Sequence, residues 1–264
     1  MAKIGVFDSG IGGLTLAAEI KKELSLHSII YFGDTAHFPY GEKSTTSIQS
    51  YAIKICNLLL EQGCEIILIA CNSASASSYE LVKEYVGKRA KVFNVIDSVV
   101  DYVCKQYNQE QIGLIGTKRT VDSNIYAERI AKGNNSIQLH SLATPLLAPM
   151  IEEGFFNKSI SNSIIAEYLS TQSFKKIAAI ILGCTHYPLI KEDIALFFNH
   201  KVEVIDSPNI VVKKIAAYIA DNNISNEIIV DHKFYVSDYT SSFNNSTQLF
   251  FGQKINLLEY KLWE

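Results

Sequence analysis

The chain has 264 residues, of which 48% are hydrophobic and 19% are charged, and its formal net charge is −3. This length suits one large domain or two of ordinary size, with enough apolar residues to fill their cores. Because nucleic acids and anionic membrane surfaces attract proteins that carry an excess of positive charge, this balance argues against both as partners.

The apolar runs are too short to cross a membrane. Runs such as 66–70 and 177–182 fall well short of the roughly 20 residues that a transmembrane helix needs. The first residues lead directly into the run 3–7, with neither the extended apolar region nor the small-residue cleavage site of a signal peptide. We therefore expect a cytoplasmic protein.

The cysteines are odd in number and form neither a CxxC pair nor a cluster with histidine. Their spacing argues against a zinc site, and the long hydrophobic segments can build a core without disulfides. We therefore expect no metal and free thiols in a reducing compartment, most of them acting as small buried hydrophobic residues. The five are Cys56, Cys64, Cys71, Cys104 and Cys184.

Short apolar runs rich in β-branched residues alternate with longer stretches of helical periodicity along the whole chain. This alternation is typical of parallel sheets that helices cover on both faces, so the sequence predicts an α/β fold with ligands beyond the carboxyl ends of the strands. The expected strands are 4–7, 29–32, 66–70, 92–94, 112–115, 137–140, 178–182, 202–205 and 228–236. The expected helices are 14–24, 47–61, 75–86, 97–107, 121–131, 159–171, 188–198 and 208–222.

The chain carries a weak internal repeat. Residues 4–9 resemble 112–117, and residues 67–73 resemble 180–186 at a nearly equal distance along the chain. Either match alone has little weight, because an apolar strand followed by a small residue is common. Together they indicate two similar α/β halves, each placing one cysteine just beyond a buried strand.

The first strand leads into the glycine-rich segment 8–13. Its sequence from Gly10 to Gly13 has neither the GxGxxG spacing of a dinucleotide site nor the Gly-Lys-Ser/Thr of a phosphate loop. One interpretation is a simple turn in which Asp8 or Ser9 caps the next helix. The other is a loop that binds a carboxylate and holds Asp8 near a reaction centre.

Two matching segments carry the remaining candidates. Cys71 is followed by small polar residues and a helix, whose amino end favours a thiolate. Cys184 also leaves a strand, and His186 follows within reach of the same site, while Pro188 suits the first turn of a helix. The alternative for either cysteine is a buried packing residue at the end of a strand.

Other segments are less specific. The loop 33–44 is long and polar, with Pro39 to make it rigid, and such loops at strand ends often carry function. Glu152 and Glu153 end an apolar run, and chemistry alone does not choose between them. We expect packing roles for Cys56, Cys64 and Cys104. No pattern of catalytic or ligand residues surrounds His27, His140, His200 and His232.

Two opposed cysteines suit the inversion of a stereocentre. One group must remove a proton from one face of the carbon, another must return a proton to the opposite face, and each acts as acid in one direction and base in the other. A thiol is suitable because its pKa, about 8.5 when free, is lowered by a helix amino end or a nearby positive charge. A carboxylate such as Asp8 would raise it, and the two thiols should titrate as a coupled pair.

The sequence resembles the glutamate racemase family, within the aspartate/glutamate racemase superfamily, over essentially its whole length. The resemblance rests on GVFDSGIGGL, GDTAHFPYGEKS, ACNSASA, GTKRTVDSNIY and LGCTHYPLI. Ser73 stands where the family more often has threonine, and it keeps the hydroxyl. The two cysteine motifs and the DSGxGG loop are specific in combination.

The resemblance implies two pseudo-symmetric α/β domains, 1–96 with 207–264 and 97–206, with glutamate in the cleft between them and no cofactor. It implies that Cys71 takes the proton of D-glutamate and Cys184 that of L-glutamate, and that D-glutamate serves peptidoglycan synthesis. Asp8 would assist the first cysteine, and His186 and Glu152 the second. The implied substrate-binding residues are Asp8, Ser9, Tyr40, Gly41, Asn72, Ser73, Thr185 and His186.

Three alternatives remain open at this point. An aspartate racemase would share the motifs, because the length of the preferred side chain depends on the geometry of the pocket. A two-cysteine redox protein would bring the two sulfurs to bonding distance, about 2.05 Å. A binding module without catalysis would use the same cleft. A homodimer is also expected, with glutamate as the ligand and neither nucleic acid nor membrane as a partner.

Overall fold

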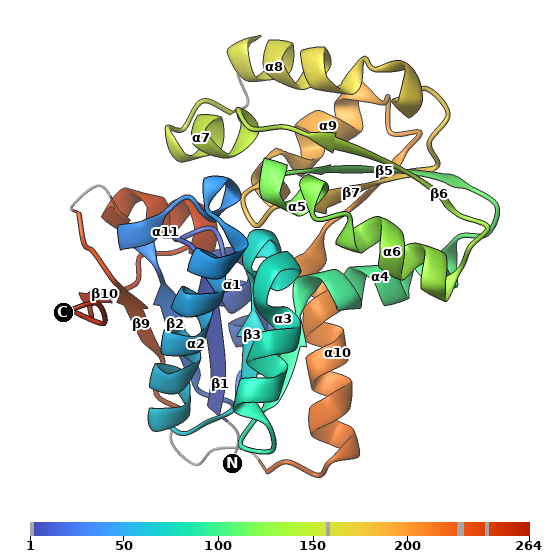
Figure 1. Cartoon of the computed structure of the whole chain (residues 1–264). Helices are drawn as coiled ribbons and strands as arrows, with labels where there is room; N and C mark the ends of the chain where they lie inside the picture. Colours follow the sequence, from blue (N-terminus) through green and yellow to red (C-terminus); the bar gives the residue numbers. More distant parts are fainter. Residues whose placement is uncertain (1–2, 157–158, 226–229, 241–242) are drawn as a thin grey trace. The chain divides into compact units, whose positions relative to one another are not determined.

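The structure is a computed structural model that describes residues 3–156, 159–225, 230–240 and 243–264. The chain divides into two compact units: the first contains Met1–Val95 and Pro208–Glu264, and the second contains Ile96–Ser207. Each unit is built on a parallel sheet with helices on both faces (Figure 1). The predicted α/β fold is therefore confirmed.

The described residues of the first unit form a six-stranded parallel sheet with the strand order β10-β9-β2-β1-β3-β4. The central strands are buried along almost their whole length, because helices cover both faces and leave no solvated side for polar residues. The strands are β1 (Lys3–Asp8), β2 (Ile29–Gly33), β3 (Cys64–Ile69), β4 (Lys91–Asn94), β9 (Lys233–Val236) and β10 (Leu257–Glu259).

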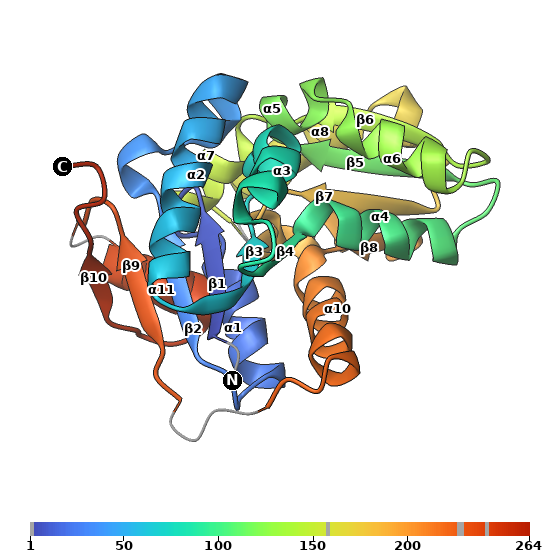
Figure 2. The same ribbon diagram turned by 60° about the horizontal axis from the view of Figure 1, so that its bottom comes forward.

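Helices cover this first sheet on each side. α2 (Thr45–Glu61) and α3 (Asn72–Val86) pack against each other on one face, and α1 (Leu14–Glu23) packs against α11 (Phe243–Phe251) on the other (Figure 2). α10 (Ser207–Asp221) lies beside β4, where the ring of Tyr218 is 5.5 Å from that of Phe93. Two short 3-10 turns, Thr35–His37 and Tyr40–Glu42, form the segment after β2.

The described residues of the second unit form a four-stranded parallel sheet with the order β6-β5-β7-β8. α4 and α6 lie on one face of this sheet and α8 and α9 on the other (Figure 1). The strands are β5 (Gln111–Gly116), β6 (Gln138–Ala143), β7 (Ala179–Gly183) and β8 (Glu203–Ile205). The helices are α4 (Val95–Gln106), α5 (Lys118–Asp122), α6 (Ile125–Gly133), α7 (Leu147–Glu152), α8 (Ser159–Leu169) and α9 (Lys191–Phe197).

Some predicted elements differ from the structure. The helix expected at 121–131 is two helices, α5 and α6, because Asn124 takes a left-handed conformation with φ 57° between them. The expected strand 228–236 is β9 only from Lys233, and its residues 228 and 229 lie outside the described residues. β3 begins at Cys64, two residues before the expected strand 66–70. α7, α11 and β10 were not predicted, since each is short or weakly patterned.

Two backbone segments approach closely at the end of β2. An added Cβ on Gly33 would lie 2.2 Å from the carbonyl oxygen of Gly10. That same oxygen accepts a hydrogen bond from the Tyr31 hydroxyl at 2.7 Å. Gly33 therefore allows the glycine-rich loop after β1 to lie directly against β2.

We expect Gly33→Ala to lower the free energy of unfolding by about 2 kcal/mol or more, because the new methyl group would collide with backbone that cannot rotate away. Gly5→Ala in β1 is the matched control, since the three atoms nearest to its Cβ belong to side chains: Cys64 Sγ and Leu59 Cδ1 at 3.1 Å and Cys64 Cβ at 3.2 Å. Denaturant unfolding of both variants measures the difference. Equal losses would contradict this account of Gly33.

Candidate active site

Three neighbouring strands of the first unit end at the same edge of the sheet. β1 and β2 are in register through Asp8 and Gly33, and β1 and β3 through Phe7 and Ile69. Because parallel strands share one direction, the segments that follow them meet at their carboxyl ends. Those segments contain the site residues predicted from the first half of the chain, namely Asp8, Ser9, Tyr40, Gly41, Cys71, Asn72 and Ser73.

Cys71 is the N-cap residue of α3. Its Sγ accepts a hydrogen bond from the Ala74 amide at 3.4 Å and lies 3.5 Å from the Ser9 hydroxyl oxygen. Only 5% of the residue is exposed, and the adjoining Asn72 and Ser73 are each 2% exposed. The amino end of a helix carries partial positive charge, so this position favours negative charge on the sulfur.

Asp8 lies fully buried beneath the glycine-rich loop. Its Oδ2 accepts a hydrogen bond from the Gly10 amide at 3.2 Å. The N-cap residue of α1 is Gly13, so neither Asp8 nor Ser9 occupies the predicted capping position. The hydrogen bond from Gly10 shows Asp8 holding the glycine-rich loop.

Tyr31 and Tyr40 show that Asp8 and Cys71 lie in one electrostatic environment. Burial raises the pKa of Tyr31 well above its usual value, and the charges of Asp8 and Cys71 raise it further. Burial and then Asp34 raise the pKa of Tyr40, with smaller contributions from Cys71 and Asp8. Both hydroxyls therefore stay protonated near this group of anions and can donate hydrogen bonds.

The site residues of the second unit gather at the end of β7. Cys184 follows this strand directly and is 7% exposed, and its Sγ lies 3.6 Å from His186 Nδ1. The other ring nitrogen, Nε2, lies 2.7 Å from Oε1 of Glu152, the last residue of α7. Thr185 Oγ1 is 3.5 Å from His186 Nδ1. Cys184, His186 and Glu152 thus form one continuous polar chain.

The partners of His186 decide its charge. Burial alone would lower the pKa of the imidazole, since it disfavours the charged form. The hydrogen bond and charge of Cys184, and after them those of Glu152, outweigh burial and raise the pKa to about 10. The ring is therefore positively charged below this pH, and that charge is lost as the pH rises through about 10. At neutral pH a positive charge therefore lies beside the Cys184 sulfur.

Sequence reasoning missed two buried polar groups that hold these segments. The Tyr187 hydroxyl lies 2.8 Å from Thr144 Oγ1 and donates to the Thr144 carbonyl oxygen at 3.1 Å, which fixes the turn after Cys184. Asp34, 0% exposed, accepts a hydrogen bond from the Tyr40 hydroxyl at 2.6 Å. The signal for Asp34 was its position directly after β2, which matches that of Asp8 at the end of β1.

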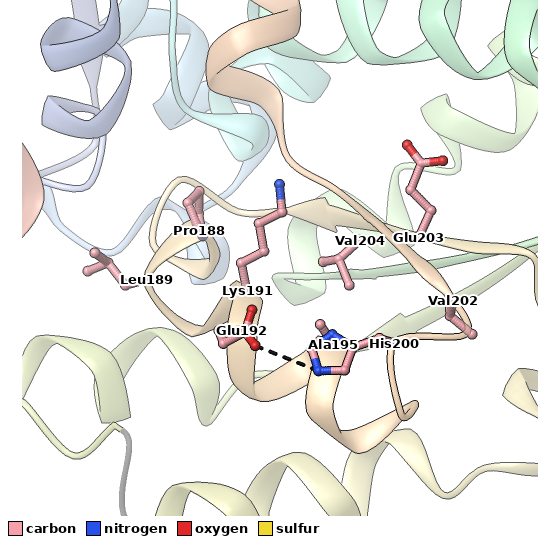
Figure 3. Close-up of a pocket in the computed structure, with 9 residues that line it drawn as sticks. All are labelled: Pro188, Leu189, Lys191, Glu192, Ala195, His200, Val202, Glu203 and Val204. Carbon is pink, nitrogen blue, oxygen red and sulfur yellow. Dashed lines mark ion pairs between the residues drawn. The ribbon is translucent and has the colours of Figure 1, made fainter.

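A separate cavity of about 490 Å³ lies in the second unit, near α9 and β8 (Figure 3). It contains none of the predicted site residues, and its charged groups have partners: Lys191 Nζ lies 3.0 Å from Asp206, and the Glu203 carboxylate accepts a hydrogen bond from Tyr102 at 2.9 Å. The candidate site is therefore at the strand ends. The lining residues are Pro188, Leu189, Lys191, Glu192, Ala195, His200, Val202, Glu203 and Val204.

Within the described ranges, no group of three or more His, Cys, Asp or Glu side chains has a geometry that would hold a metal ion. Among the same residues, no helix combines the length and the apolar character needed to span a bilayer.

The two groups of residues at the strand ends each contain one thiol. One thiol lies at the amino end of a helix, and the other lies beside an imidazolium. Thiols so placed can accept and donate protons.

We expect iodoacetamide at pH 8 to modify Cys184 faster than Cys56, because thiolate is the reactive form and burial raises the pKa of Cys56. His186→Asn should slow the labelling of Cys184 roughly tenfold, since it removes the neighbouring positive charge. Burial and Asp101 raise the pKa of Cys104, and its sulfur contacts the Ile130 carbonyl oxygen rather than His186. Its rate should therefore be the same in both proteins and serves as a control. Peptide mass spectrometry over time measures each rate, and an unchanged rate at Cys184 would contradict the assigned role of the imidazolium.

Comparison with known proteins identifies the family. The profile of the Asp/Glu/Hydantoin racemase family matches residues 14–215. The glutamate racemase of Hydrogenobaculum sp. is 37% identical over 97% of this chain and 95% of its own length. The crystal structure of the Francisella tularensis glutamate racemase, in complex with D-glutamate, matches with a TM-score of 0.93 and 38% identity over 99% of this chain and 98% of that one. A Bacillus anthracis glutamate racemase isoform matches with a TM-score of 0.92 and 29% identity over 98% and 97% of the two chains. The resemblance seen in the sequence is confirmed: the chain belongs to the Asp/Glu/Hydantoin racemase family, among its glutamate racemases.

Proposed function

We propose that this racemase interconverts L- and D-glutamate by proton transfer between the α-carbon and two cysteines, Cys71 and Cys184, without a cofactor. The observation that carries the proposal is the matched position of the two thiols. Each follows a buried parallel strand, and each sulfur has polar neighbours that suit a change of charge. The chemistry requires that the sulfurs reach opposite faces of the α-carbon.

In the direction from L- to D-glutamate, the Cys184 thiolate takes the α-proton and the Cys71 thiol returns a proton to the other face. In the reverse direction the roles exchange, and Cys71 takes the proton of D-glutamate. The Ala74 amide at 3.4 Å stabilises negative charge on Cys71. The buried Asp8 carboxylate favours the protonated thiol, so this cysteine is balanced between its two states.

His186 and Glu152 assist Cys184 as a chain of charges. The imidazolium stabilises the thiolate at 3.6 Å, and the Glu152 carboxylate at 2.7 Å holds the ring in orientation and keeps it charged. A thiolate beside an imidazolium is the activated form of a cysteine. Glu152 contacts the ring and not the reacting sulfur, so we assign it a positioning role.

The remaining predicted residues bind the substrate in this proposal. Ser9, Asn72 and Ser73 lie around the amino end of α3 and offer donors for a carboxylate. The Tyr40–Gly41 segment adds backbone groups from the loop after β2, and the Tyr40 hydroxyl holds this segment by donating to Asp34 at 2.6 Å. Thr185 and His186 serve the second unit, and Asp8 suits the ammonium group of the amino acid.

The relatives support glutamate over aspartate, since the proteins that share 33% to 37% identity with nearly the whole chain are named glutamate racemases. A redox pair receives no comparable support. We place the reaction in the cytoplasm, where D-glutamate would supply peptidoglycan synthesis. The homodimer stays a prediction.

We expect L-glutamate incubated with the purified protein in D₂O, without added cofactor, to lose its optical rotation while deuterium appears at the α-carbon. Deuterium enters because the returning proton comes from a thiol that exchanges with solvent. L-Aspartate, tested in parallel, should react at least about a hundredfold more slowly, since its carboxylate cannot reach the same donors.

Polarimetry and proton NMR measure the two processes on one sample. Folded, reduced protein that leaves both the rotation and the α-proton of glutamate unchanged would overturn the proposed function. Faster reaction with aspartate would transfer the assignment to the other branch of the family.

We expect Cys71→Ser and Cys184→Ser each to lower kcat/KM by roughly 10³-fold or more, because a hydroxyl is a far weaker acid than a thiol. Both directions lose equally, since L- and D-glutamate have equal free energies. The asymmetry should appear in isotope effects: Cys184→Ser enlarges the effect for α-deuterated L-glutamate and Cys71→Ser that for the D-enantiomer.

Cys104→Ser is the matched control for both cysteine variants, and it should retain full activity. Its thiol lies 3.8 Å from the Ile130 carbonyl oxygen in the second unit and has no role in the proposal. Isotope effects that respond identically to the two active-site substitutions would contradict the assignment of one cysteine to each enantiomer.

A further inference from the structure

The carboxyl end of the chain returns to the loop that carries Tyr40. The indole Nε1–H of Trp263 donates a hydrogen bond to Oδ1 of Asp34 at 2.9 Å, across 229 positions of sequence. Both residues belong to the first unit. The penultimate residue of the chain is therefore attached to the carboxylate that follows β2.

Asp34 connects several segments through its two oxygens. Oδ2 accepts a hydrogen bond from the Tyr40 hydroxyl at 2.6 Å, and Oδ1 accepts one from the Ser237 hydroxyl at 2.8 Å. His37 Nδ1 lies 3.0 Å from both oxygens. The carboxylate is 0% exposed. A buried charge of this kind requires hydrogen-bond donors, so the positions of these donors depend on one another.

Aromatic contacts hold the indole in place. Its ring centroid lies 4.5 Å from that of His37 in an edge-on arrangement and 5.4 Å from that of Tyr51 on α2. The Lys54 ammonium lies 5.0 Å from the indole centroid. His37 in turn stacks on Tyr51 at 4.0 Å. The indole is thus held against α2, and it transmits that position to Asp34.

We propose that Trp263 is a positioning residue for the racemase reaction, which holds the substrate-binding segment Tyr40–Gly41 in place through Asp34. The inference rests on the proposed function, in which this segment contacts glutamate. Among the residues that the structure describes, Trp263 contacts Asp34, His37, Tyr51 and Lys54, and none of these is a cysteine or a hydrogen-bond partner of one. Its loss should therefore weaken substrate binding while the proton-transfer step keeps its rate, a change in KM with kcat nearly constant.

The test compares Trp263→Phe, which keeps an aromatic ring and removes the N–H donor, with Lys261→Ala in the same tail. Lys261 pairs with Glu264 at 2.7 Å and its side chain is 62% exposed, so it is the matched control. We expect Trp263→Phe to raise KM for glutamate roughly fivefold, as the loss of one hydrogen bond to a charged group implies, with kcat within about twofold. Lys261→Ala should leave both constants unchanged.

A double-mutant cycle with Tyr40→Phe separates action through Asp34 from a general effect on folding. If Trp263 acts through the Asp34–Tyr40 hydrogen bond, the two substitutions together should raise KM by less than the product of their separate effects. Multiplicative effects, or a loss of thermal stability with an unchanged KM, would overturn the inference.

Fluorescence gives a second measurement that does not depend on any variant. Trp263 is the only tryptophan in the sequence, so intrinsic emission reports on it alone. Glutamate binding to the wild-type protein should shift or quench this emission with a midpoint that matches KM, whereas L-lysine should not. Absence of any change at saturating glutamate would count against the coupling.

The outcomes distinguish the two proposals. Wild-type protein that fails to exchange the α-proton of glutamate overturns the function. Active wild-type protein, together with a folded Trp263→Phe variant of unchanged KM, overturns only the role of Trp263.

Discussion

The parallel pairing of β1, β2 and β3 is the constraint on which the rest of the site depends. Parallel strands must end at one edge, so residues that are far apart in sequence meet there without a dedicated scaffold. Asp8 ends β1, Asp34 follows β2, and Cys71 follows β3. The same rule places Cys184 after β7 in the second unit. Helices on both faces of each sheet exclude solvent from these strands and keep them in fixed register.

In the proposed reaction the two cysteines have the same role in different surroundings. The charge on Cys71 is influenced by backbone dipoles, because its sulfur caps α3. The buried Asp8 carboxylate, which acts on Tyr31 together with Cys71, opposes that effect. Cys184 has a charged neighbour instead, because the raised pKa of His186 keeps a positive charge on the ring 3.6 Å from its sulfur. A reversible inversion needs two groups that each function as acid and base, and it does not require identical neighbours. The two halves of the weak internal repeat therefore both have a cysteine at a strand end, while the residues around the two cysteines differ.

Much of this protein follows from local sequence. Continuous apolar runs between helical patterns determine an α/β fold, since only strands buried on both faces lack alternating polar residues. The motifs around Cys71 and Cys184 are local as well, and each contains its cysteine, a strand end and the next helix. Family membership followed from those motifs in combination. Weakly patterned elements such as α7 and β10 escaped prediction, and the break at Asn124 did so because a single left-handed residue leaves the periodicity of helix 121–131 intact.

Only the tertiary structure shows which residues, far apart in sequence, form hydrogen bonds to the same carboxylate. Residue chemistry alone did not separate Glu152 from Glu153, and only the family resemblance favoured Glu152. In the structure its carboxylate lies 2.7 Å from His186, because α7 packs against the turn after Cys184. Asp34 looked like an ordinary loop residue, and the fold surrounds it with Tyr40, Ser237 and Trp263. Hydrogen bonds of this kind join segments with no common pattern. Their geometry depends on how the sheets and helices pack, which one-dimensional periodicity does not record.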